Sequence, residues 1–174
     1  MHAFLIELSR QRRYWLLLLM VGIALEGAAL YYQYVLDEWP CVLCIHVRIL
    51  VMAFILLATL ALFCTSSLPM MRLLHGVNSL IMLWLVERSW QVLAVERGWI
   101  FGDCSLDLGM PAWFALDKWL PAIFEVQTSC GYSPLILFDI TMAEALLVIS
   151  ILLLIISATL FVTSWQDYNN IESG

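Results

Sequence analysis

Four long apolar runs constrain the fold of this 174-residue chain more than any other feature of its sequence. They cover residues 14–34, 45–64, 73–95 and 143–165. Each approaches or exceeds the roughly 20 residues that a helix needs to cross the hydrocarbon core of a bilayer. With 63% hydrophobic and 13% charged residues, the chain is too apolar for a soluble domain of its size. We therefore predict an all-α integral membrane protein, a four-transmembrane-helix bundle that forms a single membrane domain over 1–174.

The positive charges beside the first run predict the orientation of the chain. Arg10, Arg12 and Arg13 precede this run, which places the N-terminus in the cytoplasm, and four crossings return the C-terminus to the same side. The loops at about 35–44 and 96–142 then face outward. The first run has no convincing cleavage site, so we predict that it is retained as a span rather than removed as a signal peptide.

Four of the five cysteines fall in the outward loops, on the side of a membrane where disulfides persist. Cys41 and Cys44 form a C-x-x-C pair at the end of the first loop, and Cys104 and Cys130 lie in the second. Cys64 lies at the opposite end of the second run and is most simply a small buried hydrophobe. Two pairs of cysteines in two loops on one face indicate disulfide chemistry.

The segment PCVLCIHVR, residues 40–48, is suited to thiol exchange. A proline such as Pro40 fits the first turn of a helix, where unpaired N–H groups favour the thiolate form of Cys41 and Cys44. Arg48 lies one turn beyond Cys44 on the same face, where its charge could hold a thiolate or an anionic ligand. A bond that closes so short a loop adds little stability, so the spacing favours exchange over a structural role.

Metal binding and structural bridging are the alternatives to redox chemistry for these cysteines. A zinc site is disfavoured because Cys104 and Cys130 supply no second C-x-x-C, and we predict no metal. For Cys104 and Cys130 the alternative is a structural bridge that tethers a long loop. No nucleotide-binding loop or basic nucleic-acid patch is visible, so we predict no nucleic-acid partner.

The segments PCVLCIHVR and LDKWLPAIF, at residues 116–124, together with Cys104 and Cys130, resemble the DsbB family. Its members are disulfide-generating proteins of the bacterial inner membrane, and the resemblance covers nearly the whole chain. It implies an enzyme, a quinone-dependent protein disulfide oxidoreductase, with both termini cytoplasmic and the active cysteines periplasmic.

The resemblance also implies a role for each cysteine. Cys104 and Cys130 would oxidise a periplasmic DsbA-like thiol oxidase, with Cys104 attacked by the partner and Cys130 leaving to reach Cys41. Cys41 and Cys44 would pass the electrons to ubiquinone or menaquinone, and Arg48 matches the arginine that the family places beside the quinone. Two thiol pairs in series can carry electrons from a soluble partner to the membrane.

Three further expectations concern the surroundings of this site. His46 could stand near the quinone in place of a histidine that family members carry, the alternative being a solvated loop histidine. Residues 111–124 predict a short interfacial helix on the outer leaflet, or else an ordinary buried loop helix. Glu26 and Arg88 lie at similar depth and are predicted to form an ion pair, unless Glu26 is protonated and serves proton uptake by the quinone.

Two rival functions remain at this point. One is a vitamin K epoxide reductase-like quinone-linked enzyme, although that family carries its C-x-x-C near the last helix rather than the second. The other is a non-enzymatic membrane subunit with structural disulfides. Counting free thiols after mild reduction would distinguish them, because an enzyme should contain an easily reduced pair.

Overall fold

Four long helices make up most of the computed structural model, which describes residues 11–64, 68–102, 107–137 and 139–172. These helices are α2 (Arg12–Val35), α3 (Val42–Cys64), α4 (Leu68–Glu96) and α7 (Met142–Glu172). Each contains a stretch long and apolar enough to cross a membrane. The predicted fold class, a four-helix membrane protein, is confirmed.

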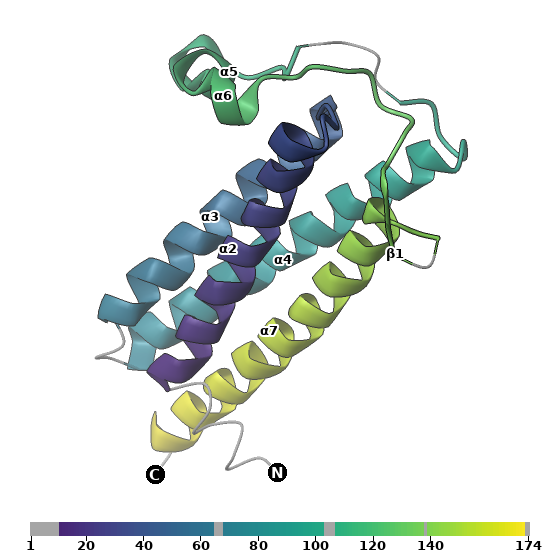
Figure 1. Cartoon of the computed structure of the whole chain (residues 1–174). Coiled ribbons are helices and arrows are strands. Elements are labelled where there is room, and N and C mark those ends of the chain that lie inside the picture. The colour runs from purple at the N-terminus through teal and green to yellow at the C-terminus, as the bar shows by residue number, and fades with distance from the viewer. Residues whose placement is uncertain (1–10, 65–67, 103–106, 138, 173–174) are drawn as a thin grey trace.

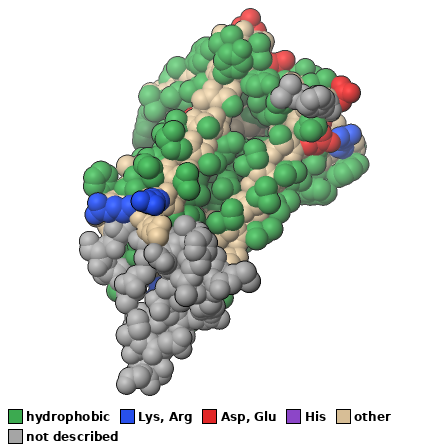
Figure 2. Space-filling view, turned by 60° about the horizontal axis from the view of Figure 1, so that its bottom comes forward, with side chains coloured by type: hydrophobic (Ala, Val, Ile, Leu, Met, Phe, Trp, Pro, Cys, Tyr) green, Lys and Arg blue, Asp and Glu red, His purple; other side chains and the backbone are tan. Residues whose placement is uncertain are grey.

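The helices pack in chain order, α2 on α3, α3 on α4 and α4 on α7, and the start of α2 lies at the same end of the bundle as the end of α7 (Figure 1). Large apolar side chains such as Leu17, Phe63 and Leu80 point outward from the helices. Figure 2 shows hydrophobic side chains along the helices, with charged ones gathered toward the ends. An apolar outer surface of this kind suits contact with lipid.

The second loop carries short helices, as expected, but not one continuous helix over residues 111–124. It contains a 3₁₀ turn at Ala112–Phe114, α5 at Leu116–Trp119 and α6 at Pro121–Phe124. Leu120 leaves the helical conformation with φ −135°, and Pro121 then starts a new turn. A proline is tolerated at the start of a helix but not inside it, which explains the break.

The start of α7 contains two features that sequence reasoning missed. Strands β1 (Leu135–Leu137) and β2 (Ile140–Thr141) form a small antiparallel hairpin directly before the helix. Thr141 and Glu144 then form a capping box: the Thr141 hydroxyl accepts from the Glu144 N–H at 3.3 Å, and the Glu144 carboxylate accepts from the Thr141 N–H at 3.1 Å. The spacing T-x-x-E in TMAE was the available signal.

Polar and aromatic side chains also meet in the half of the bundle away from these loops. The Asn78 amide on α4 donates to the Ser157 hydroxyl on α7 at 2.7 Å. The His75 ring stacks on Trp15 of α2 with centroids 4.9 Å apart, and Tyr14 packs beside both rings. We call these five residues the inner polar cluster. They join three helices deep in the apolar bundle.

Candidate redox site

Cys44 lies in the first turn of α3, as predicted, whereas Cys41 directly precedes the helix and Pro40 stands before the first turn rather than in it. The Cys41 carbonyl accepts the N–H of Ile45 at 3.0 Å, which begins the helical hydrogen bonding. The two sulfur atoms are 3.1 Å apart. A disulfide would hold them about 2.05 Å apart, so this pair is a dithiol in hydrogen-bond contact. One turn of helix thus keeps the two sulfurs within reach of each other.

Backbone contacts bring the second loop onto the first. The N–H groups of Gln127 and Thr128 both donate to the Pro40 carbonyl, at 3.0 and 3.3 Å. Thr128 also forms an isolated parallel bridge with Cys41. This pairing places the Cys130 thiol in hydrogen-bond contact with the Cys41 thiol. The structure therefore brings together three of the four predicted redox cysteines.

Two further features seat Cys130. The backbone N–H groups of Leu43 and Val42, in the first turn of α3, lie near its sulfur and lower its pKa, although Cys41 and burial outweigh them. Gly102 packs so closely that a Cβ atom there would stand 3.2 Å from the Cβ of Cys130 and 2.7 Å from a methyl group of Val95. A side chain at position 102 would therefore have to displace Val95 and crowd Cys130.

Cys104 lies outside the described residues, so its position relative to Cys130 is not part of the site as described. No disulfide joins the cysteines in the described ranges, and Cys64 sits at the far end of α3. Among the cysteines of the described ranges, the contact that joins the two loops is thus the one between Cys41 and Cys130.

The surroundings of Cys41 and Cys130 favour the protonated thiols. For Cys41, the hydrogen bond with Cys130 lowers the pKa, but the hydrogen bond with Cys44 and burial outweigh it and raise the pKa to about 12. For Cys130, the hydrogen bond with Cys41 and burial raise the pKa above its usual value. In the reduced site, Cys41 and Cys130 are therefore protonated thiols that share a hydrogen bond.

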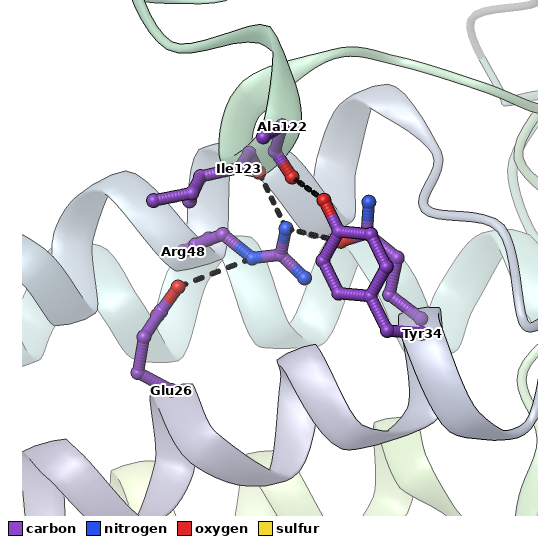
Figure 3. Close-up of polar contacts among 6 residues, drawn as sticks. Glu26, Tyr34, Arg48, Ala122 and Ile123 are labelled. Atoms are coloured by element: carbon purple, nitrogen blue, oxygen red, sulfur yellow. Dashed lines mark hydrogen bonds and ion pairs between the residues drawn. The ribbon is translucent and has the colours of Figure 1, made fainter.

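Arg48 lies on α3 one turn beyond Cys44, and its guanidinium is held by three groups (Figure 3). Its Nε forms an ion pair with the Glu26 carboxylate of α2 at 3.3 Å. Its Nη1 donates to the Gln33 side-chain oxygen at 2.7 Å and to the Ile123 carbonyl of α6. Arg48 is thus a buried cation that bridges two helices and the second loop.

The predicted ion pair between Glu26 and Arg88 is wrong. Arg88 instead pairs with its neighbour Glu87 at 3.2 Å and donates to Gln91 at 3.0 Å. Depth in the membrane, which motivated the prediction, does not fix the direction of a side chain around its helix. Because α2 packs mainly on α3, Glu26 faces Arg48 of that helix.

The short helix α6 is anchored over the ends of α2 and α3. The Tyr34 hydroxyl donates to the Ala122 carbonyl, and Arg48 donates to that of Ile123 (Figure 3). Carbonyls at the end of a helix lack partners within it, so donors of this kind satisfy them. The anchor holds α6 a few residues before the segment that pairs with Pro40.

A cavity of about 310 Å³ opens beside these groups. Cys41, Cys44, Arg48 and Glu26 line it, together with mostly apolar side chains from all four long helices and from both loops. Small-molecule sites in proteins range from about 300 to 1,000 Å³ and are mostly apolar with a few polar groups. The cavity has the size and lining of such a site.

His46 is not the solvated loop residue of the alternative interpretation, and its place near a quinone stays a prediction. It is half-buried, and it does not line the cavity. Its Nε2 lies 3.4 Å from the Leu108 carbonyl of the second loop. This contact helps to hold the loop against α3 beside the small apolar cluster of Ile45 and Phe124.

Gln33 is a site residue that sequence reasoning missed. It lies in the apolar run of α2, and its side chain is buried against Arg48. A polar residue inside a transmembrane run is itself a signal, because its burial is costly without a partner. Within the described ranges, no group of three or more His, Cys, Asp or Glu residues could hold a metal ion.

Comparison with known proteins places the chain in a family. The model of the family "Disulfide bond formation protein DsbB" matches residues 11–160. Three curated relatives named "Disulfide bond formation protein B" come from Shewanella denitrificans, Photorhabdus laumondii and Shewanella frigidimarina, and are 31%, 27% and 33% identical to it. The matches cover 80%, 95% and 79% of this chain, and 81%, 98% and 82% of those relatives. The chain therefore belongs to the DsbB family and is a multi-pass membrane protein of disulfide bond formation.

Proposed function

We propose that this protein reoxidises a periplasmic DsbA-like thiol oxidase and passes the electrons to a membrane quinone. The observation that carries the proposal is the position of Cys41, whose sulfur contacts Cys44 on its own helix and Cys130 of the second loop. Thiol–disulfide exchange requires direct attack of one sulfur on another. A sulfur in contact with both pairs can pass electrons between them.

The exchange steps balance in atoms and electrons. The partner dithiol attacks a Cys104–Cys130 disulfide, leaves as a disulfide and gives two electrons and two protons to these cysteines. Cys130 then attacks Cys41 of a Cys41–Cys44 disulfide and releases Cys44. Attack by Cys104 on Cys130 restores the disulfide of the second loop and leaves Cys41 and Cys44 as the dithiol that the structure describes.

The cavity supports the final electron transfer. Its volume and apolar lining suit a quinone ring, with Cys44 and Arg48 in the wall. A bound ubiquinone or menaquinone would accept two electrons and two protons, which is what oxidation of one dithiol releases. Arg48 supplies a fixed positive charge beside Cys44, which favours negative charge on that sulfur and in the cavity.

Anaerobic titration tests this function directly. Purified protein is mixed with a reduced DsbA-like protein and a quinone, and the quinone absorbance is followed. We expect one quinone to be reduced for each partner dithiol oxidised. Partner oxidation without quinone consumption, or no oxidation at all, would contradict the proposal.

Trapping the partner tests the order of the cysteines. A partner that lacks its resolving cysteine should remain bound as a mixed disulfide, because no second thiol can release it. Mass spectrometry should place the link at Cys104, and Cys104→Ser should abolish it. A link at Cys41 or Cys44 would show that the partner is oxidised directly by the pair on α3.

The orientation belongs to the same proposal. The arginines before α2 favour a cytoplasmic N-terminus, which puts the cysteine loops in the periplasm of a bacterial inner membrane. A reporter placed in the loop between α4 and α7 should be periplasmic, and one fused after Gly174 cytoplasmic. A cytoplasmic loop reporter would overturn the assignment of the site.

A further inference from the structure

Glu26 is a buried acid that the electron path described above does not use. Its carboxylate lies in the wall of the cavity, 3.3 Å from Nε of Arg48, and the two side chains are only 10% and 4% exposed. A charged pair at this depth in an apolar helix bundle is costly, so its presence calls for a function.

The contacts of Arg48 fix the direction of its charge. Glu26 holds Nε from α2, while Gln33 and the Ile123 carbonyl hold Nη1 (Figure 3). Because a guanidinium is planar, contacts at two of its nitrogens fix the plane of the whole group. The Glu26 carboxylate contacts Nε, the guanidinium nitrogen that lies nearest the backbone of α3.

Glu87 and Arg88 form an ion pair of the same kind that lies outside the cavity. Its Nε-to-oxygen distance is 3.2 Å, almost the same, but its side chains are 46% and 28% exposed and do not line the cavity. An exposed pair contributes little. The two pairs therefore share chemistry and differ in surroundings, which makes the second a matched control.

We propose that Glu26 is a positioning residue for quinone reduction: it holds the Arg48 guanidinium beside Cys44 in the orientation that the cavity requires. The proposal rests on the proposed function and adds a residue to it. Misplacing a group by about 1 Å can cost as much as about 100-fold in rate, so loss of this contact should be measurable.

The test measures quinone and partner kinetics separately. We expect Glu26→Ala to raise the KM for quinone about tenfold and to leave the KM for the reduced thiol oxidase unchanged. Glu26→Gln should restore most of the affinity, because its amide oxygen can occupy the position of Oε1. Glu87→Ala should change neither constant.

A second readout does not depend on turnover. In protein labelled with ¹⁵N-arginine, Glu26→Ala should shift the Arg48 Nε–H signal and speed its exchange with solvent, whereas Glu26→Gln should not. If Glu26→Ala fails to fold, Glu26→Asp replaces it, because the shorter side chain withdraws the carboxylate from Arg48.

Several results would overturn the proposal. They are an unchanged quinone KM, an equal rise of both KM values, equal impairment by Glu26→Gln, and an unchanged Arg48 signal. If the unsubstituted protein reduces quinone normally and one of these results is found, only the role of Glu26 fails. If the unsubstituted protein reduces no quinone, the proposed function fails as well.

Discussion

The two ends of the helix bundle bury polar groups in different ways. At the end that carries the cysteine loops, Cys41, Cys44, Arg48 and Glu26 line a cavity of about 310 Å³. In the inner polar cluster, by contrast, the polar and aromatic groups pack directly on one another, with Asn78 bonded to Ser157 and His75 stacked on Trp15. In both arrangements, contacts between the polar groups offset the free-energy cost of burying them in an apolar bundle. Only the first arrangement leaves room for a ligand.

The presence of a cavity distinguishes candidate ligand-binding residues from polar residues that only pack against one another. A polar residue inside a transmembrane helix is by default a functional candidate. Within this chain that rule alone would select Asn78 as readily as Arg48. The cavity is what distinguishes them, and substitutions at the two ends should therefore affect different properties of the protein.

The largest effect should come from removing a sulfur at the end that carries the cysteine loops. Cys44→Ala should abolish quinone-dependent thiol oxidation, because the Cys41–Cys44 disulfide can no longer form. Cys64→Ala is the matched control, since it makes the same change at the other end of α3 and should cost at most about 1 kcal/mol of stability. Quinone absorbance measures the activity of both variants, and thermal unfolding measures their stability. A loss of activity in Cys64→Ala would show that the two ends of α3 do not differ in function.

The next largest effect concerns the alkylation rate of Cys41, which protonation of its thiol should lower strongly. Hydrogen bonding with Cys44 and burial, which outweigh the opposite effect of Cys130, raise its pKa to about 12. Only the thiolate reacts, and an ordinary cysteine has a pKa of about 8.5, so at pH 8 the thiolate fraction should be lower by roughly three orders of magnitude.

Mass spectrometry of the reduced protein, treated with iodoacetamide between pH 7 and 10, checks this. Alkylation of Cys41 should rise about tenfold with each pH unit over this range, because the pH stays below its pKa. The unfolded protein is the reference, in which the rate should level off near pH 9. A plateau at that pH in the folded protein would contradict the hydrogen-bonded thiol.

Arg48 should have a smaller but still large effect. Arg48→Ala should lower kcat/KM for quinone by about 100-fold, because it removes the fixed positive charge beside Cys44 and leaves Glu26 unpaired. Arg48→Lys should be milder, since it keeps the charge but not the planar group. Arg88→Ala provides the control from the exposed pair, and equal kinetics for Arg48→Ala and Arg88→Ala would refute the role of Arg48.

The smallest effect should come from the inner polar cluster. Asn78→Leu removes the hydrogen bond to Ser157 and should lower the stability by about 1 kcal/mol, with quinone kinetics of the folded enzyme unchanged. Thr159→Val is its control, because that hydroxyl bonds only to the Ile155 carbonyl of its own helix. Impaired quinone reduction by Asn78→Leu would show that the inner cluster also serves catalysis.

The sequence was sufficient to predict the four helices and the face that carries Cys41, Cys44 and Cys130, because apolar length and cysteine placement are local properties. It was not sufficient to predict the partner of Glu26. Residues at equal depth can point in different directions, and only helix packing decides which of them meet. The capping box at Thr141 was readable but overlooked.

The contacts that hold the two loops together could not have been read from residue types. Pro40 accepts hydrogen bonds from the backbone N–H groups of Gln127 and Thr128, and neither side chain takes part in these bonds. Any residue except proline supplies such an N–H group. A pattern of residue types therefore carries no trace of this contact.

The same backbone contact makes the meeting of Cys41 and Cys130 tolerant of mutation. Side chains at positions 127 and 128 can change while the Pro40 carbonyl keeps both of its donors. Gly102 is the opposite case, because even the smallest side chain there would collide with Val95 and crowd Cys130. Substitutions other than proline at positions 127 and 128 should therefore leave this contact intact, whereas a side chain at position 102 would have to displace Val95 or Cys130.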